Sequence, residues 1–495
     1  MAAAYGPAVS SVERIDTHIS IVWLAGDRAY KLKRAVHFDY VDFSTIDRRQ
    51  AACEAEVRLN RRTAPSVYLD VRPVSREADG SLAIGGYGNP VDWLVEMVRF
   101  DQETLFDRLA ARHRLDLALM AGLADAIVRL HETAEPRPDR GGRDGMRWVV
   151  GGNALGLAEQ GAGVFDPSFV ERLIGDTRAV LDRHGDLLEA RRTGGRVRHC
   201  HGDLHLRNIC LVDGRPTLFD AVEFNDDISC IDVLYDLAFL LMDLWRRDLR
   251  HHANAVFNEY LSQTVDLAGL RLLPLFLSCR AAVRAKTGAT AAAVQTEAAR
   301  ASDMQDTARE YLDLARQLLR PVAPSLIAVG GFSGSGKSTL ARALAPGIGA
   351  PPGALIVRSD AIRKARFGVA PSTRLGPEGY APAVSQAVYR TIAERARAAL
   401  EAGHSVIADA VYASPEERAM IAALAREAGV PFRGLWIDAP PAILVERLRG
   451  RTGDASDATP EVLQRQLQIE RGLIDWQRLD GSSDPTSVLR QAGAW

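Results

Sequence analysis

One stretch of eight residues constrains the fold of this chain more than any other feature. It reads G-F-S-G-S-G-K-S from Gly331 to Ser338 and matches the pattern G-x-x-x-x-G-K-S/T. Residues 325–330 before it form a short apolar run, and residues 339–344 after it have the composition of a helix. A phosphate-binding loop joins a strand to a helix in this way, so we expect a nucleoside triphosphate to bind here. A Gly/Ser linker that ends in Lys-Ser is the alternative, and the flanking strand and helix argue against it.

The residues of this loop suit different parts of a triphosphate. Glycines let backbone N–H groups face phosphate oxygens, Lys337 reaches the terminal phosphates, and the hydroxyl of Ser338 can ligate Mg²⁺. We therefore expect ATP and Mg²⁺ as cofactors. The residues expected to contact them are Gly331, Ser333, Gly334, Ser335, Gly336, Lys337, Ser338 and Thr339.

The remaining chain is long enough for a second domain. Its 495 residues exceed what one ordinary core accommodates. A formal net charge of −2 provides no global basic field, which argues against nucleic acid or an anionic membrane as a partner. Five scattered cysteines without C-x-x-C spacing favour reduced thiols, and we find no leader or membrane-spanning apolar run. We expect a cytoplasmic protein.

A short proline-containing segment predicts the domain boundary. Pro321 and Pro324 end the preceding helical pattern and stiffen the connection between them. We therefore predict one domain over residues 1–320, a linker over 321–324 and a second domain over 325–495. A linker this short predicts that the two domains contact each other.

The first of these domains begins with a sheet pattern. Residues 18–24 and 28–33 predict a β-hairpin whose second strand places Lys31 and Lys33 on one face. The elements predicted after it are a helix over 45–62 with Glu54 and Glu56, strands over 67–74 and 92–99, and a mostly helical region over 102–135. This order suggests two lobes joined near residues 96–99.

Three polar residues further along the chain suit phosphoryl transfer. Asp203 precedes Asn208 by five residues, and Asp220 follows a short apolar strand. An acid can orient or deprotonate an acceptor hydroxyl, while an amide and a second acid hold Mg²⁺ against the phosphates of ATP. A polar turn with incidental histidines is the alternative interpretation.

Residues 10–318 resemble the aminoglycoside phosphotransferase and choline kinase family, a branch of the protein-kinase-like fold. The resemblance implies a bilobal α+β domain that binds ATP and a small hydroxyl acceptor. It also implies these roles: Asp203 as catalytic base, Asn208 and Asp220 as metal ligands, Lys31 as the phosphate-binding lysine, Glu56 as its ion-pair partner, and Glu96 to Val98 as the adenine-binding hinge. Lys33 and Glu54 remain alternatives to Lys31 and Glu56.

The chain departs from the protein kinases in two places. The hairpin has no G-x-G-x-x-G loop, and Asp220 is followed by Ala221, Val222 and Glu223 rather than by Phe-Gly, so we expect no activation switch of the protein-kinase type. Of the acids that follow, Asp232 and Asp236 either attract a polyamine acceptor or brace the catalytic loop, and we favour bracing. The domain should end in helices over 252–263, 268–285 and 297–319, with a turn near Gly288.

Beyond the phosphate-binding loop, strand and helix patterns alternate. Strands over 353–358, 405–409 and 433–437 alternate with helices over 382–402 and 414–428, which predicts an α/β domain with a parallel sheet covered on both faces. Ligands bind at the carboxyl ends of such strands. The candidate residues there, or on the helix that follows, are Asp360, Arg363, Asp409, Arg447 and Arg451.

This half resembles the P-loop kinases of small molecules and polynucleotide ends, such as gluconate kinase, polynucleotide kinase and zeta-type toxins. The resemblance implies that Asp360 is the base for an acceptor hydroxyl, that Arg363 binds acceptor or phosphate, and that Asp409 organises the Mg²⁺ site. Arg447 and Arg451 would close over the phosphate as a lid. A helix N-cap for Asp360 and a solvated helix face for the two lid arginines are the alternatives.

The sequence thus predicts two fused ATP-dependent kinases. Each would transfer the γ-phosphate of ATP to a hydroxyl of a small polar molecule. One alternative is an ATP-sensing regulatory or toxin-antitoxin-like protein with only one catalytic domain. Another is polynucleotide 5′-hydroxyl kinase activity in the second domain.

Overall fold

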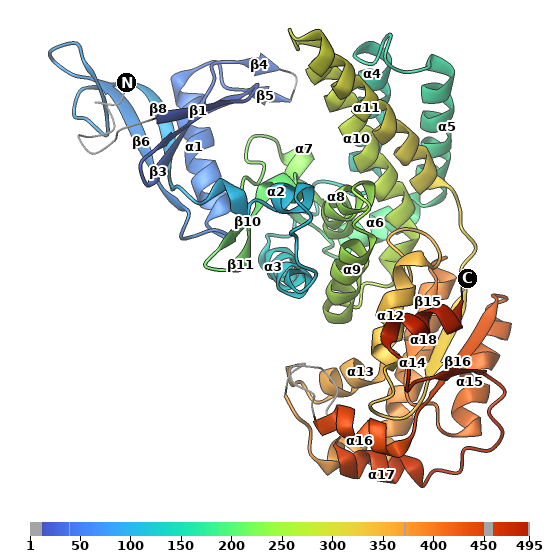
Figure 1. Cartoon of the computed structure of the whole chain (residues 1–495). Helices are drawn as coiled ribbons and strands as arrows, with labels where there is room; N and C mark the ends of the chain where they lie inside the picture. The colour runs from blue at the N-terminus through green and yellow to red at the C-terminus, as the bar shows by residue number, and fades with distance from the viewer. Residues whose placement is uncertain (1–11, 39, 371–372, 450–458, 494–495) are drawn as a thin grey trace. The chain divides into compact units, whose positions relative to one another are not determined.

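A computed structural model describes residues 12–38, 40–370, 373–449 and 459–493 (Figure 1). Contacts divide the chain into two compact units, and neither is one continuous stretch of sequence. The first unit comprises Met1–Asp243 and Cys279–Leu312, and the second comprises Leu244–Ser278 and Asp313–Trp495. Helices α8, α10 and α11 therefore contribute residues to both units.

The elements of the first unit are mostly short strands followed by longer helices. Its strands are β1 (Val12–Asp16), β2 (Ser20–Ala25), β3 (Arg28–Lys33), β4 (His37–Phe38), β5 (Val41–Asp42), β6 (Tyr68–Arg76), β7 (Leu82–Ile84), β8 (Asn89–Val98), β9 (Val197–His199), β10 (Ile209–Val212), β11 (Arg215–Leu218) and β12 (Cys230–Asp232). Its helices are α1 (Ile46–Asn60), η2 (Gln102–Thr104), α2 (Phe106–Ala111), α3 (Leu119–Thr133), α4 (Gly142–Glu159), α5 (Pro167–Arg183), α6 (Gly185–Thr193), η3 (Leu206–Asn208), α7 (Asp226–Ser229), α8 (Val233–Arg246), α10 (Leu273–Ala293) and α11 (Ala298–Leu319).

A six-stranded antiparallel sheet forms the first lobe of this unit. The strand order is β1-β2-β3-β8-β6-β7, and α1 packs against β6 and β8 (Figure 1). Cys53 and Val57 of α1 share a buried apolar cluster with Val95 of β8 and Tyr68 of β6. In β3, Lys31 and Lys33 lie two residues apart and point to the face that α1 covers, since both contact Glu56 of that helix.

The second lobe is built on helices and two small hairpins. The strand pairs β10-β11 and β9-β12 flank the segment 200–208, which holds the predicted catalytic aspartate. Helix α8 is the most deeply buried helix next to that segment, and Leu237 to Met242 are at most 2% exposed. A rigid buried helix therefore supports a loop whose own residues are polar.

The second unit alternates strands with helices. Its elements are α9 (Arg250–Thr264), η4 (Ala268–Leu272), β13 (Leu326–Gly330), α12 (Lys337–Leu344), η5 (Ala345–Gly347), β14 (Leu355–Arg358), α13 (Ser359–Arg366), η6 (Pro377–Tyr380), α14 (Pro382–Glu401), β15 (Val406–Asp409), α15 (Pro415–Glu427), β16 (Phe432–Asp438), α16 (Pro441–Arg449), α17 (Pro460–Leu467), β17 (Gln477–Asp480) and α18 (Pro485–Ala492).

Its five strands form a wholly parallel sheet in the order β14-β15-β13-β16-β17. Every residue of the central strand β13 is buried, which requires cover on both faces of the sheet. Parallel pairing brings the carboxyl ends of β13, β14 and β15 to one edge, where Arg358 lies opposite Asp409 in the register. The phosphate-binding loop leaves β13 at the same edge.

A helix from the middle of the chain completes the edge of this sheet. Asn258 of α9 accepts a hydrogen bond from the backbone N–H of Ile356 at 2.6 Å, and Asn254 donates to the carbonyls of Pro352 and Ala354 at 3.1 Å each. Phe257 packs on the ring of His404, with ring centroids 5.0 Å apart. Side chains of α9 thereby satisfy backbone groups of the edge strand β14 that no further strand pairs.

Most elements expected from the sequence are present, with small differences at their ends. The prediction of a turn near Gly288 is wrong, because α10 continues to Ala293. Gly288 packs closely against Ala308 of α11. Strand β17 was not expected from the sequence. All five cysteines are free and buried. Among the described residues, no helix is long and apolar enough to cross a membrane.

Candidate active sites

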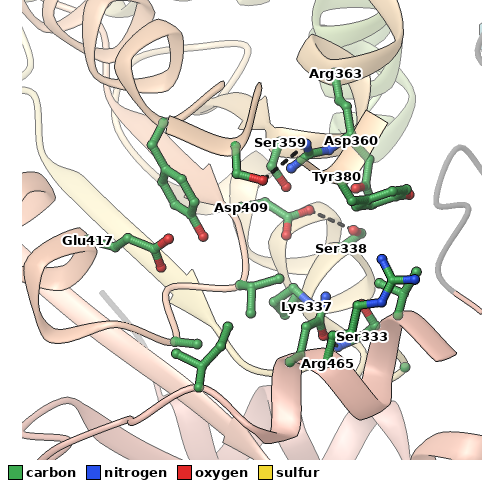
Figure 2. A pocket seen from close by; sticks show the side chains of 18 of the residues that line it. Ser333, Lys337, Ser338, Ser359, Asp360, Arg363, Tyr380, Asp409, Glu417 and Arg465 are labelled. Carbon is green, nitrogen blue, oxygen red and sulfur yellow. Dashed lines mark hydrogen bonds between the residues drawn. The ribbon is translucent and has the colours of Figure 1, made fainter. Parts of the chain in front are cut away.

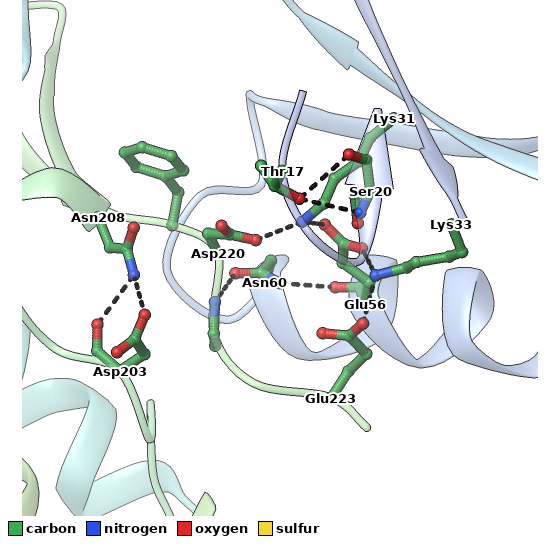
Figure 3. Close-up of polar contacts among 12 residues, drawn as sticks. Thr17, Ser20, Lys31, Lys33, Glu56, Asn60, Asp203, Asn208, Asp220 and Glu223 are labelled. Atoms are coloured by element: carbon green, nitrogen blue, oxygen red, sulfur yellow. Dashed lines mark hydrogen bonds and ion pairs between the residues drawn. The ribbon is translucent and has the colours of Figure 1, made fainter. Parts of the chain in front are cut away.

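The first site contains a cluster of charges between β3, α1 and the strand end at Asp220. The Nζ atom of Lys31 lies 2.8 Å from Oε1 of Glu56 and 2.5 Å from Oδ1 of Asp220 (Figure 3). Glu56 is fully buried, and its pKa falls to about 2 because the two nearby lysines outweigh the effect of burial, which raises it. The structure therefore brings together the lysine, the glutamate and one metal ligand that the sequence suggested.

Lys33 forms a second ion pair in the same cluster. Its ammonium group contacts both Glu56 and Glu223, and the side chains of Lys33 and Glu223 are 1% and 3% exposed (Figure 3). Burial raises the pKa of Glu223, and Lys33 acts against that shift. Glu54 bonds instead to Gln50 at 2.9 Å on the exposed side of α1. Glu56 thus takes part in both ion pairs, and Lys31 is the lysine next to Asp220.

The predicted catalytic loop places Asp203 beside Asn208. The Nδ2 group of Asn208 donates to the backbone carbonyl and to Oδ2 of Asp203, both at 2.9 Å. His205 Nε2 lies 3.3 Å from the same carboxylate oxygen. Burial raises the pKa of Asp203, but the neighbouring His205 more than offsets it, so the pKa lies well below its usual value. Asp203 is therefore ionised at neutral pH.

Helix α8 braces this loop through two carboxylates. Asp236 accepts hydrogen bonds from the backbone N–H groups of His201 and Gly202 at 3.1 and 2.9 Å, and Asp243 accepts one from Leu206 at 3.1 Å. Arg280 donates to the carbonyl of Gly202 at 3.2 Å. Bracing, which the sequence favoured over polyamine binding for Asp236, is the role that these contacts describe.

The Asp220 segment is fixed to the first lobe by backbone hydrogen bonds. The N–H of Asp220 donates to the Tyr68 hydroxyl at 3.1 Å, and the next N–H, of Ala221, donates to Asn60 Oδ1 at 2.8 Å. Asp220 itself has a φ of +61°, in the left-handed region that aspartate, asparagine and histidine adopt more often than other residues with a side chain. The backbone of this segment is thus held in place, and the carboxylate of Asp220 contacts Lys31.

The expected adenine-binding hinge at Glu96 to Val98 lies at the end of β8. The side chain of Glu96 pairs with Arg72 at 2.8 Å and with Arg28 at 3.6 Å, and the N–H of Val98 donates to the carbonyl of Val67. These groups are occupied within the sheet. A contact between them and a nucleotide stays a prediction.

The second site is the phosphate-binding loop between β13 and α12. Gly334 has a φ of +84°, and a Cβ there would lie 2.8 Å from the carbonyl oxygen of Leu444, so a side chain is excluded at this position. Gly336, with a φ of +97°, precedes the first turn of α12. Lys337 Nζ lies 3.0 Å from the carbonyl of Phe332 in the same loop. The loop therefore has the backbone that the sequence pattern predicts.

A cavity of about 320 Å³ opens from this loop (Figure 2). It is lined by residues of the loop and of the strand ends beside it. Those that matter below are Ser333, Gly334, Gly336, Lys337, Ser338, Asp360, Arg363, Tyr380, Tyr389, Asp409, Glu417 and Arg465. Thus Asp360 and Arg363, one turn apart on α13, share a cavity with Lys337, as expected from the sequence.

Of the two predicted lid arginines, Arg447 is not among the residues that line this cavity. Arg447 donates to the carbonyl of Gly481 at 2.7 Å and lines a neighbouring cavity of about 310 Å³ with Gly334, Ser335, Gly336 and Thr339. Gly331, the first residue of the motif, has a φ of +137°. Arg451 lies outside the described residues. A lid role for either arginine stays a prediction.

Sequence reasoning missed three charged residues of the cavity or its rim. Arg358, at the end of β14, lies 3.5 Å from Asp409 and 3.3 Å from the Ser338 hydroxyl. Glu417 comes from α15, and Arg465 comes from α17. The carboxyl end of β14 could have indicated Arg358, whereas no local pattern distinguishes Glu417 or Arg465 from solvated helix residues.

The side-chain oxygen atoms at both sites are suited to binding Mg²⁺. In the second site the Ser338 hydroxyl donates to Oδ2 of Asp409 at 2.6 Å, which pairs a hydroxyl with a carboxylate next to the phosphate-binding loop (Figure 2). In the first site, Figure 3 shows the amide of Asn208 and the carboxylate of Asp220 on the same side of the cluster. Hard oxygen ligands of this kind, few in number and beside a phosphate site, are what Mg²⁺ requires.

Comparison with known proteins agrees with this geometry. The model of the phosphotransferase enzyme family matches residues 25–273. The chain belongs to this family. In this phosphotransferase a second model, that of an AAA domain, matches residues 326–471. The expected fold class is confirmed: a protein-kinase-like fold comes first, and a P-loop domain with a parallel sheet follows.

Similar proteins match either most of the phosphotransferase or one part of it. Uncharacterised proteins of Mycobacterium tuberculosis and Mycobacterium bovis are 32% identical over 462 residues, which cover 90% of this chain and 88% of each relative. A sugar kinase from Janibacter is 26% identical over 34% of this chain and 92% of its own, with a TM-score of 0.25. A choline/ethanolamine kinase family protein from Mesorhizobium loti is 13% identical over 63% of this chain and 94% of its own, with a TM-score of 0.39.

Proposed function

We propose that this phosphotransferase is bifunctional, and that each unit transfers the γ-phosphate of ATP to a hydroxyl group of a small polar molecule. One observation supports this proposal above the others. Each site contains a lysine, a pair of groups with the oxygen atoms that Mg²⁺ prefers, and a further aspartate. In the first site these are Lys31, Asn208 with Asp220, and Asp203; in the second they are Lys337, Ser338 with Asp409, and Asp360.

In the first site, Asp203 would receive the acceptor. Because the pKa of Asp203 lies below its usual value, its ionised carboxylate can accept a hydrogen bond from an acceptor hydroxyl and take the proton as the oxygen attacks phosphorus. Lys31 would neutralise phosphate charge, and Glu56 positions its ammonium group. Mg²⁺ held by Asn208 and Asp220 would supply charge neutralisation at the phosphates.

In the second site, the loop and α12 would hold the phosphates. Backbone N–H groups of the loop and the N-terminus of α12 attract phosphate oxygens, and Lys337 adds a positive charge. Asp360 lies in the same cavity, where it can orient an acceptor hydroxyl. Catalysis at both sites would then consist of positioning and charge neutralisation.

Variants of the full-length chain test the proposal. Wild type, Asp203→Ala, Lys337→Ala and the double variant would be incubated with Mg·ATP and a metabolite panel, with ADP release and ³¹P NMR of products as readouts. We expect each single variant to lose one set of acceptors and keep the other, and the double variant to lose both. Acceptor phosphorylation that survives in the double variant contradicts the proposal. Loss of all phosphorylation in one single variant indicates a single catalytic unit.

A further inference from the structure

Three side chains of the first unit form a group of potential metal ligands that neither candidate active site uses. They are His199, Asp226 and Cys230, and one ligand atom of each lies within 4.8 Å of the other two. None of them belongs to the charge cluster around Lys31 or to the pair of Asp203 and Asn208. Nitrogen, oxygen and sulfur ligands of this kind lie about 2.0–2.3 Å from the ion in Zn²⁺ sites. Small side-chain movements would therefore bring all three within bonding distance of one ion.

Regular secondary structure brings these three residues together. Cys230 of β12 lies opposite His199 of β9 in the antiparallel register, and side chains opposite each other in such a pair project from the same face. Asp226 begins α7, and its carbonyl accepts a hydrogen bond from the N–H of Cys230, one helical turn later. Residues four apart on a helical turn lie on the same side. The backbone therefore fixes the spacing of the three side chains.

The ring of His199 is in the form that binds a metal ion. Burial lowers its pKa, and the nearby Arg62 lowers it further, so the imidazole is neutral at pH 7. Its Nε2 atom is buried and forms no hydrogen bond with any described residue. A buried ring nitrogen without a partner has lost its hydrogen bonds to water, and coordination of a metal ion would compensate for them.

Arg137 provides the positive charge next to the other two ligands. Its Nη1 donates to Sγ of Cys230 at 3.1 Å, and its Nη2 lies 3.0 Å from Oδ2 of Asp226. The same guanidinium forms two further hydrogen bonds with Asp139, at 2.9 and 2.8 Å. The side chain of Arg137 is 18% exposed and that of Asp226 is 41% exposed, so an ion can enter from solvent. Zn²⁺ would displace Arg137 from both ligands, and Asp139 would remain its partner.

Zn²⁺ balances the charge of this ligand set. Burial raises the pKa of Cys230 to about 11, so the thiol keeps its proton until a metal ion replaces it. The resulting thiolate and the carboxylate of Asp226 together cancel the charge of a divalent ion, and a partly buried site favours zero net charge. Mg²⁺ prefers oxygen ligands, so the ion expected at the two candidate active sites would not compete here.

We propose that His199, Asp226 and Cys230 bind a Zn²⁺ ion, with a fourth coordination position open to water. Binding forms one bond from the ion to each side chain, and the thiol proton passes to solvent. The site goes beyond the proposed function, because no step of phosphoryl transfer uses it. Strand β9 leads directly into the segment 200–208, and α7 and β12 follow the segment of Asp220. Bound Zn²⁺ would therefore link the two segments that hold the predicted catalytic groups.

Metal analysis of the full-length protein tests the assignment. Protein stripped with a chelator would be dialysed against Zn²⁺ in excess Mg²⁺, and bound metal would be measured by mass spectrometry. We expect about one Zn²⁺ per chain. In a parallel sample Co²⁺ replaces Zn²⁺, and the absorption band of a cobalt–thiolate bond reports a cysteine ligand. That band should disappear in Cys230→Ser and remain in Cys210→Ser, whose buried cysteine lies on β10 outside the ligand set.

Three more variants identify the other ligands and the competing cation. His199→Gln and Asp226→Asn should each lower Zn²⁺ affinity at least about tenfold, because residues that only support a metal ligand already contribute about 10- to 100-fold. Arg137→Met keeps all three ligands and should raise Zn²⁺ affinity about tenfold or more, because the ion no longer displaces a charged hydrogen-bond donor. This gain in affinity cannot result from a loss of folding.

Several outcomes overturn the assignment. These are loss of all bound Zn²⁺ in excess Mg²⁺, or a cobalt–thiolate band that survives in Cys230→Ser. Loss of the band in Cys200→Ser with its retention in Cys230→Ser would place the ion instead at the buried group of His131, Cys200 and Asp236. Weaker Zn²⁺ binding in Arg137→Met would show that the arginine supports the ligands and does not compete with the ion. All of these readouts are obtained without an acceptor, so they do not depend on the proposed function.

Discussion

Replacing Lys33 by methionine tests how the buried charges of the first site are balanced. The side chains of Lys33, Glu223 and Glu56 are at most 3% exposed, and Lys33 contacts both glutamates. In the variant, Glu56 keeps Lys31 as its partner, whereas Glu223 loses the lysine that it contacts. A lone buried carboxylate avoids the penalty of its charge by taking up a proton.

The size of the effect follows from that proton. The reference pKa of Glu223 is 4.5, so protonating it in the folded state costs about 3 kcal/mol at pH 7 and less than about 1 kcal/mol at pH 5. The sign is that of a group whose pKa is raised on folding: the folded variant holds a proton that the unfolded chain releases above pH 4.5, so stability falls as pH rises. We expect Lys33→Met to lower the melting temperature by about 5–10 °C at pH 7.

Calorimetry of the full-length protein measures this difference. The unfolding transition that shifts in Lys33→Met would be followed at pH 5 and pH 7, alongside Glu223→Gln and the double variant. Because the double variant contains no unpaired buried charge, it should be more stable at pH 7 than Lys33→Met alone. Equal destabilisation of Lys33→Met at both pH values, or additive losses in the double variant, would refute the reasoning.

Three further predictions concern the supports of the two sites. Burial lowers the pKa of His404 from 6.5 to about 4, so the unfolded chain takes up a proton before the folded chain does as pH falls. The free energy of unfolding should therefore drop by about 2 kcal/mol from pH 7 to pH 5. Calorimetry of His404→Gln should show no such dependence. In the Lys337→Ala protein, Asp236→Asn should slow acceptor-dependent ADP release by the first site at least about tenfold, because the catalytic loop loses the carboxylate that accepts its N–H groups. The affinity of the first site for ATP should not change. Asn258→Ala should destabilise the second unit by about 1–3 kcal/mol and speed hydrogen exchange at Ile356; unchanged exchange there would argue against the α9 contact.

The sequence predicted those parts of the sites that local patterns encode. Patterns that span only a few residues identified four parts of the sites: the phosphate-binding loop, the pair of Asp203 and Asn208, and the strand ends at Asp220 and Asp409. Their chemistry could therefore be proposed without coordinates. The same holds for the alternating strands and helices of the second unit, whose periodicity follows from burial on a parallel sheet.

What the sequence could not predict depends on distant segments. The choice between Glu54 and Glu56 needs the rotation of α1 against β3, because residues two apart on a helix point in different directions. Glu417 lines the cavity because α14 and α15 pack beside the phosphate-binding loop. The sequence around Glu417 does not differ from that at the start of other helices. A turn was expected near Gly288, but α10 continues through this residue, which packs closely against Ala308 of α11.

The docking of α9 on β14 bears on any attempt to express the C-terminal P-loop domain by itself. A fragment that starts at Ser325 would lack Asn254, Phe257 and Asn258, and the N–H of Ile356 would lose its acceptor. The edge strand β14 would then expose unpaired backbone groups to a second molecule, and the strands of two molecules would pair. Insoluble or oligomeric fragments would reflect this missing helix rather than an inherently unstable enzyme.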